Sequence, residues 1–387
     1  MELHLLDNNR RRTEVVDDFE SCIWSERYTS WGDFELLMKS TPGTRSLFKS
    51  GRWFVQNQSS RVMEVETLED KVTGGKSMLS IKGRSIEKIL DDRAAVNSIA
   101  GTATAEKWAL TGTPANIART IFSSVCSTGY PSVNDKVPFL ESVFTTLQYQ
   151  RPEPGTTISV ELEKQSVYKA IKDLCEAYGL GFYLVRVGDT DQLRFKVITG
   201  YDRTLGQTTF APVVFSQALG NLSDTTELYS TQNFKNVAYV YGKNGFVTVY
   251  APGYDSSVTG FDRRVMVIKA DDITDAAGAT LTSKLNQRGY DELAKQRGIF
   301  AFEGTIPQRG SYKYAKDYFL GDLVTMQNSD GVQSSMRVVE QIFVCDREGD
   351  KSYPSLQVEL TAQPGSWGYE DPTDTWAAAT TETWSTS

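Results

Sequence analysis

The sequence predicts an α+β protein that is mainly β, with two β-rich segments on either side of a mixed α/β segment. Apolar and polar residues alternate in short runs over residues 1–82, a pattern typical of half-buried strands. Helical spacing of apolar residues follows in the middle of the chain, and period-two runs return after about residue 206. At 387 residues, the chain is long enough for two or three domains.

These changes of period divide the chain into four expected parts. Residues 1–95 form part of a first β domain, with the turn spacing of a small barrel or sandwich. Residues 96–205 form an α/β insertion, and residues 206–365 form a second β domain with one helical insertion. Residues 366–387 form a polar tail that contains tryptophans.

A β-hairpin is predicted near the start of the chain, in the stretch CIWSERYTSWGDFELLMKS. Cys22, Trp24, Glu26 and Tyr28 alternate with Ile23, Ser25 and Arg27, and Phe34, Leu36 and Met38 share one face after the turn. Gly and Asp in the segment between the two runs are residues that favour turns. The stretch therefore predicts two antiparallel strands around an aromatic turn.

The α/β insertion and the helix before it carry recognisable helix signals. Helices are expected to begin at Ser85, at Thr113 and at Ser166, each of which is a capping residue. Pro114 suits the first helical position, and Gly179 suits the left-handed stop of the third helix. The runs GFYLVRV and QLRFKVI then predict a strand pair.

The second β domain contains eight strand-like runs and one helical stretch. Hairpin turns are predicted at residues 243–245 and 329–331, because each contains an Asn-Gly or Asp-Gly pair. The helix is expected near residues 276–297, with a buried side formed by Leu281, Leu285 and Leu293.

The charge of the chain argues against one class of function. The chain has 41 Lys and Arg against 49 Asp and Glu, a formal net charge of −8. A chain without a basic stripe does not bind nucleic acid tightly through phosphates. The longest apolar runs are far shorter than a bilayer span, so we expect neither stable membrane insertion nor a signal peptide.

The sequence offers no constellation of catalytic or metal-binding residues. The single histidine, His4, lies beside the start of the first strand, and a Ser-His-Asp or Cys-His site needs an imidazole. The four cysteines are far apart without a CxxC pair, which predicts buried free thiols and no metal or cofactor. A pair of facing carboxylates, which suffices for a glycosidase, is not testable from sequence spacing.

The tail contains Trp367, Trp376 and Trp384 together with four carboxylates and no lysine or arginine after residue 365. Tryptophan is enriched at protein interfaces. We therefore expect these three residues to anchor the tail on a partner chain.

Six stretches carry a resemblance to a known family. They are RYTSWGDFELLM (27–38), LSIKGRSIEKILDDRAA (79–95), LRFKVITGYDRT (193–204), VVFSQALGNLSD (213–224), NFKNVAYVYG (233–242) and YFLGDLVTMQ (318–327). Together and in this order, they resemble the tail-hub proteins of long-tailed phages, especially the minor tail proteins of phages that infect actinobacteria.

The resemblance implies a structural and non-enzymatic role at the virion tail tip, after assembly in the cytoplasm of the bacterial host. Such hubs are similar to the central hub of contractile-phage baseplates and consist of two related β-barrel domains with inserted α/β elements. Three copies form a pseudo-sixfold ring that joins the sixfold tail tube to the threefold tip. The expected partners are two further copies, the distal tail protein, the tape-measure protein and other tail-tip proteins, while genomic DNA passes through without specific binding.

In this interpretation Gly32 permits the turn, and Phe34 and Leu36 fill the first barrel. For Tyr28 and Trp31, two placements are left open: in the core, or at an interface with a neighbouring subunit. Gly321 and Asp322 form the corresponding Gly-Asp turn in the last resembling stretch. Two alternative functions also remain open: a carboxylate-dependent cell-wall hydrolase, and a tail protein that binds a receptor or carbohydrate.

Overall fold

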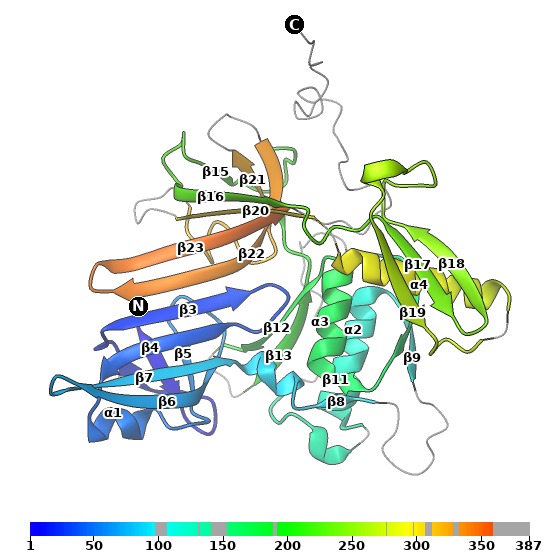
Figure 1. Cartoon of the computed structure of the whole chain (residues 1–387). Coiled ribbons are helices and arrows are strands. Elements are labelled where there is room, and N and C mark those ends of the chain that lie inside the picture. The colour runs from blue at the N-terminus through cyan, green and yellow to red at the C-terminus, as the bar shows by residue number, and fades with distance from the viewer. Residues whose placement is uncertain are drawn as a thin grey trace, which may run out of the picture. The chain divides into compact units, whose positions relative to one another are not determined.

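Figure 1 shows the computed structural model of the chain. The structure describes residues 1–96, 107–130, 132–140, 153–188, 192–275, 277–296, 298–305, 312–327 and 333–358. The chain divides into two compact units. Unit 1 contains Met1–Glu227 and Ala301–Glu359, and unit 2 contains Leu228–Phe300 and Leu360–Ser387. The chain passes between the units at strands β16 and β20.

Unit 1 is mainly β, as the sequence predicts. Its strands up to the insertion are β1 (Leu3–Leu6), β2 (Arg12–Val16), β3 (Ser21–Arg27), β4 (Asp33–Lys39), β5 (Trp53–Gln56), β6 (Met63–Thr73), β7 (Lys76–Ser85) and β8 (Ala94–Ala95). The later strands are β9 (Trp108–Gly112), β10 (Ile158–Leu162), β11 (Gln165–Ser166), β12 (Gly181–Arg186), β13 (Leu193–Ile198), β14 (Asp202–Arg203), β15 (Val214–Ser216), β16 (Ser223–Ser230), β20 (Ile299–Thr305), β21 (Leu323–Gln327), β22 (Gln333–Asp346) and β23 (Gly349–Val358). Its α-helices are α1 (Pro42–Leu47), α2 (Pro114–Phe122) and α3 (Val167–Ala177).

One large sheet joins the two ends of the sequence within unit 1. Its strand order is β16-β20-β23-β22-β3-β4-β7-β6-β5-β1-β2, with β21 beside β22, and β14 and β15 parallel to β21. The first and last strands of this order do not pair with each other among the described residues, so no closed barrel is found there. The central link is the antiparallel pair β3 and β22, which places Trp24 opposite Phe343.

The predicted hairpin is present as β3 and β4, and it contributes to an aromatic core. Trp24 lies opposite Phe34 in the register of the two strands. Phe54 packs edge-on against Trp24, Phe34 and Phe48, with ring centroids 5.6, 4.7 and 5.9 Å away. All four rings are buried: alternation along the strands turns Trp24, Phe34 and Phe54 to one side of the sheet, and Phe48 reaches them from the end of α1.

The α/β part of unit 1 follows the predicted helix signals at two of three positions. Thr113 caps α2 through the backbone N–H of Asn116, and Ser166 caps α3 in the same way. The helix expected at Ser85 is only a short 3₁₀ helix, Ile86–Leu90, and Ser85 does not cap it. The Ser85 hydroxyl instead accepts a hydrogen bond from the N–H of Gly32 at 2.8 Å, because β7 runs straight up to this residue.

Helices α2 and α3 lie side by side against the antiparallel pair β12 and β13 (Figure 1). Phe122 of α2 stacks on Phe195 of β13, with centroids 4.1 Å apart and planes 7° apart. Gly179 ends the α3 segment with a φ of +64°, the left-handed stop that the sequence predicts. The hydrophobic core around this packing also includes Leu6 and Val55 of the first β segment.

Unit 2 is a small α/β unit formed by β17 (Val237–Gly242), β18 (Gly245–Tyr250), β19 (Val265–Ala270) and α4 (Ala279–Lys295). The strand order is β18-β17-β19, with β17 antiparallel to β18 and parallel to β19. The tight turn predicted at residues 243–245 joins β17 to β18, whereas the turn at 329–331 lies outside the described residues.

Helix α4 covers one face of this sheet with the leucines that the sequence predicts. Leu281, Leu285 and Leu293 are buried in the cluster that also contains Val240 and Val249. The helix approaches closely because Gly289 has no side chain, and a Cβ there would lie 2.5 Å from a methyl carbon of Val249. No helix among the described residues is long and apolar enough to cross a membrane.

The four cysteines are free thiols, as predicted. Cys22, Cys126 and Cys175 are buried, and Cys345 is half-buried. Burial raises the pKa of Cys22 and that of Cys126 to about 12, and it raises the pKa of Cys175 as well. Burial and a hydrogen bond with Asp350 also raise the pKa of Cys345.

These pKa values predict slow alkylation of the native thiols. A thiol with a pKa of about 12 is thiolate to only ~0.01% at pH 8, and the thiolate is the reactive form. We expect iodoacetamide to modify Cys22 and Cys126 at least ~100-fold more slowly in the native chain than in urea. Mass spectrometry of timed samples measures the rates, and modification of Cys22 at the unfolded rate would contradict the described burial.

Candidate functional site

Tyr28 connects three distant segments of unit 1 through its main chain. It follows β3 and is only 2% exposed. Its N–H donates to the carbonyl oxygen of Val339 at 2.9 Å, and its carbonyl oxygen accepts from the N–H of Phe182 at 3.1 Å. The first β segment, the α/β insertion and the last β segment therefore meet at one residue, and we call this place the Tyr28 junction.

The side chain of Tyr28 continues this connection. Its hydroxyl lies 2.9 Å from the carbonyl oxygen of Ile198 and accepts a hydrogen bond from Nη1 of Arg337 at 3.2 Å. The same nitrogen donates to the carbonyl oxygens of Thr199, at 3.0 Å, and Gly321, at 2.9 Å. Since Arg337 is buried, these three acceptors replace the water that its charge would otherwise need.

Two glycines allow the backbone to approach the Tyr28 ring, and a third allows close packing against one of them. A Cβ on Gly181 would lie 2.2 Å from a ring carbon of Tyr28, and a Cβ on Gly321 would lie 2.4 Å from the same carbon. A Cβ on Gly200 would lie 2.0 Å from the carbonyl oxygen of Gly321. Gly321 also has a φ of +88°, which L side chains rarely adopt. The ring is thus enclosed by main chain from two segments.

Asp322 fixes the loop beside the junction. One of its carboxylate oxygens accepts from the N–H of Tyr201 at 2.8 Å. The other accepts from Nε of Arg203 at 2.8 Å and from the N–H of Phe319 at 3.0 Å. Burial raises the pKa of Asp322, and these hydrogen bonds and the Arg203 charge act in the opposite direction. Gly321 and Asp322, the predicted Gly-Asp pair, therefore make their contacts inside unit 1.

Trp31 packs within unit 1, between an aromatic ring and a cation. Its ring stacks on Tyr168 of α3, with centroids 3.9 Å apart and planes 24° apart. The Arg84 guanidinium lies 4.7 Å from the Trp31 ring and forms two hydrogen bonds with Glu66, of 2.9 and 2.8 Å. These bonds lower the pKa of Glu66, so the pair stays charged at neutral pH.

Gly32 and Phe34 occupy the hairpin as close-packed residues. A Cβ on Gly32 would lie 2.1 Å from the carbonyl oxygen of Ser25, so the glycine is required by this close approach. Its φ is outside the left-handed region, so the close approach to Ser25, and not a positive φ, is what requires glycine here. Phe34 is buried in the aromatic core described above. The structure thus places Tyr28, Gly32 and Phe34 inside the chain.

Comparisons with known proteins decide the family. Residues 2–353 match the family model described as Siphovirus ReqiPepy6 Gp37-like protein. The chain belongs to this family. No curated protein matches the sequence.

Solved structures of phage tail proteins share the fold of this chain. The tail protein from Neisseria meningitidis MC58 matches with a TM-score of 0.58 and 14% identity, over 94% of this chain and 98% of its own. The 43 kDa tail protein of prophage MuSo2 from Shewanella oneidensis matches with a TM-score of 0.55 and 14% identity, over 92% and 97%. An E. coli type VI secretion component, described as similar to T4 tail proteins gp27 and gp5, matches at 0.44 with 8% identity, over 94% and 78%.

The chain contains a second buried polar group that sequence reasoning missed. Arg61 and Glu87 form an ion pair of 2.6 Å in which both side chains are at most 5% exposed. Glu87 also accepts from the N–H of Leu184 at 2.8 Å, and Arg61 donates to the carbonyl oxygen of Arg27 at 3.1 Å. Neither residue stands out in the sequence, because both lie in ordinary charged stretches.

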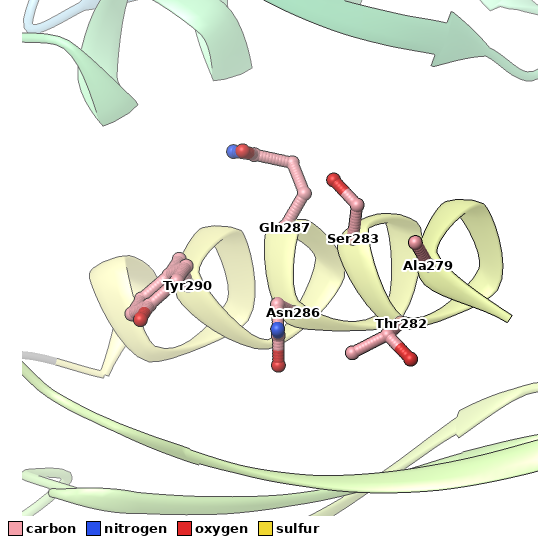
Figure 2. A pocket seen from close by; sticks show the side chains of 6 residues that line it. All are labelled: Ala279, Thr282, Ser283, Asn286, Gln287 and Tyr290. Carbon is pink, nitrogen blue, oxygen red and sulfur yellow. The ribbon is translucent and has the colours of Figure 1, made fainter.

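A metal site or a pocket in the described residues would require a particular arrangement of side chains. No group of three or more His, Cys, Asp or Glu residues there is placed to bind a metal ion. A shallow hollow of about 440 Å³ lies on α4 (Figure 2), and Tyr290 is its sole titratable lining residue. Its other lining residues are Ala279, Thr282, Ser283, Asn286 and Gln287. Trp367, Trp376 and Trp384 lie outside the described residues.

Removing the Tyr28 hydroxyl tests the hydrogen bonds of the junction. We expect Tyr28→Phe to lower the free energy of unfolding by about 1–3 kcal/mol, because Arg337 and the Ile198 carbonyl lose a partner without access to water. Urea unfolding followed by tryptophan fluorescence measures this. Tyr290→Phe, at a half-exposed ring on α4, is the matched control and should change stability by less than ~0.5 kcal/mol. Equal effects of the two variants would refute the role of the hydroxyl.

Gly321→Ala tests the packing of the main chain on the Tyr28 ring. The new Cβ would meet the ring at 2.4 Å, so we expect a loss of about 3 kcal/mol or more in the free energy of unfolding. Gly220→Ala is the control, since Gly220 has a φ of +65° and no atom within 4 Å of its Cβ position. It should cost only about 1 kcal/mol. Similar losses of stability in both variants would show that the positive φ alone accounts for the effect, without a contribution from the Tyr28 ring.

Proposed function

We propose that this phage tail protein is the structural hub of the tail tip. Three copies, each with two related β domains, form a pseudo-sixfold ring that joins the sixfold tail tube and distal tail ring to the threefold tip. The ring surrounds the DNA channel and acts through its geometry, without catalysis. The observation that carries the proposal is the family match over residues 2–353, together with the likeness of the fold to whole tail proteins.

The repeated Gly-Asp strand start supports two related domains. Gly32 immediately precedes β4, which begins at Asp33, and Gly321-Asp322 immediately precedes β21. In both places the glycine is packed too closely for a side chain, and the aspartate pairs with an arginine: Asp33 with Arg27 at 2.7 Å, and Asp322 with Arg203 at 2.8 Å. A long hairpin follows each strand later in the chain, β6 and β7 in the first case and β22 and β23 in the second.

The open ends of the large sheet suit assembly into a ring. Among the described strands, β2 pairs only with β1, and Val15 on β2 is well exposed. An edge strand offers unpaired backbone groups to another chain. In the proposed ring, this edge contacts a neighbouring copy, while the Tyr28 junction holds the two halves of each copy together.

The proposed partners follow from this position in the virion. The hub contacts the distal tail protein, the end of the tape-measure protein and other tail-tip proteins, after assembly in the bacterial cytoplasm. Genomic DNA passes through the ring without specific binding, which agrees with the net charge of −8 because like charges repel. Against the alternative of a wall hydrolase, the buried Glu87 and Asp322 each pair with an arginine inside unit 1, which gives both carboxylates a structural role.

Electron microscopy tests the hub. We expect averaged images of the purified chain, with and without its neighbouring tail proteins, to contain threefold rings, because two β domains from each of three copies supply six ring positions. Light scattering after gel filtration should then give three times the chain mass of 43.1 kDa in the ring-forming sample. Single particles of one chain mass in every sample would overturn the proposal.

A further inference from the structure

Unit 2 has an exposed aromatic face on the side of its sheet that α4 leaves uncovered. Alternation along the strands puts Tyr239, Tyr241, Phe246, Tyr250 and Val267 on this side, which we call the aromatic face. Tyr241 lies opposite Phe246, with ring centroids 4.8 Å apart. These two residues and Val267 are 47%, 50% and 63% exposed. A contiguous apolar surface of this kind marks a place of contact.

Cations border the aromatic face. Arg263 donates to the Tyr239 hydroxyl at 3.1 Å, and its guanidinium lies 5.9 Å from the rings of Tyr239 and Tyr250. Lys269 is exposed and is the register partner of Tyr241. Residues 228–300 contain nine Lys and Arg against seven Asp and Glu, in a chain whose overall charge is −8. The face therefore suits a partner that is acidic and aromatic.

One segment of the same chain has this chemistry. Residues 359–387 contain three tryptophans and five carboxylates and have no lysine or arginine. We propose that this segment docks on the aromatic face of its own chain, with indole rings against Tyr241 and Phe246 and carboxylates near Arg263 and Lys269. Indole and phenyl rings pack favourably, and cations and carboxylates add attraction at the rim.

The length of the segment permits the contact. A stretch of 29 residues can span up to about 95 Å when extended, which exceeds the width of a chain of this size. Because the segment is covalently attached, its effective concentration at its own chain is on the order of millimolar, far above that of a separate copy in dilute solution. The reach of the segment and its high effective concentration favour the chain's own face as the site, whether or not the chain is a hub.

Limited digestion with chymotrypsin tests the docking in the full chain. Cleavage after Trp367, Trp376 and Trp384 is followed by mass spectrometry in the wild type and in the double variant Tyr241→Ala, Phe246→Ala. We expect the double variant to lose these three cleavage sites about tenfold faster, because two ring contacts are removed. Tyr290→Ala is the matched control, since Tyr290 is equally exposed but lies on α4, and it should be cleaved at the wild-type rate. Equal cleavage of wild type and double variant would overturn the proposal.

A mixing experiment identifies the source of the segment. Full-length double variant is incubated, at about 1 μM and thus far below the millimolar effective concentration, with a chain that ends at residue 358 and has an intact aromatic face. If docking occurs within one chain, the added face does not restore protection of the three tryptophans. Restored protection would show that the face receives the segment of another copy, and the proposal of docking within one chain would be wrong.

Discussion

The buried guanidinium of Arg337 is the charge on which the architecture of unit 1 depends. Because it is buried away from water, its N–H groups need acceptors inside the chain. A single nitrogen, Nη1, donates to the Tyr28 hydroxyl and to two carbonyl oxygens. Those acceptors come from the end of β3, from the strand pair of the insertion and from the loop before β21. A shift of any one segment would leave a buried donor or acceptor unsatisfied, which makes their mutual positions cooperative.

The glycines add close packing to these hydrogen bonds. Gly181 and Gly321 each bring main chain to within contact of the Tyr28 ring, so the carbonyl groups can reach the guanidinium beside it. Asp322 holds the same loop from the other side through the N–H groups of Tyr201 and Phe319. Small residues thus permit the close approach of the backbone, and the close approach permits the hydrogen bonds. These bonds hold together the one sheet that contains strands from both ends of the sequence.

Local signals in the sequence predicted local structure well. Period-two alternation predicted the hairpin around Phe34, and cap residues such as Ser166 predicted the helix starts, because both depend on neighbours within a few positions. The sequence did not predict that Tyr28 is buried against an arginine 309 residues later, or that Arg61 pairs with Glu87. Such contacts depend on how distant segments meet, and a buried arginine looks like an exposed one in a single sequence. The Ser85 hydroxyl does not cap its helix for the same reason, since it accepts a hydrogen bond from the N–H of Gly32, just before β4.

In unit 2, the strands have apolar residues on both faces of the sheet, which indicates a contact on each face. Strands of a sheet covered on one side usually alternate apolar with polar residues, yet β17 and β18 carry valines toward α4 and aromatic residues on the opposite side. The helix accounts for the valines, and its close approach at Gly289 leaves no room for anything else on that side. The aromatic residues have no covering element among the described residues of unit 2. Since exposing Tyr241 and Phe246 to water is unfavourable in proportion to their apolar area, a further partner for this side would stabilise the unit.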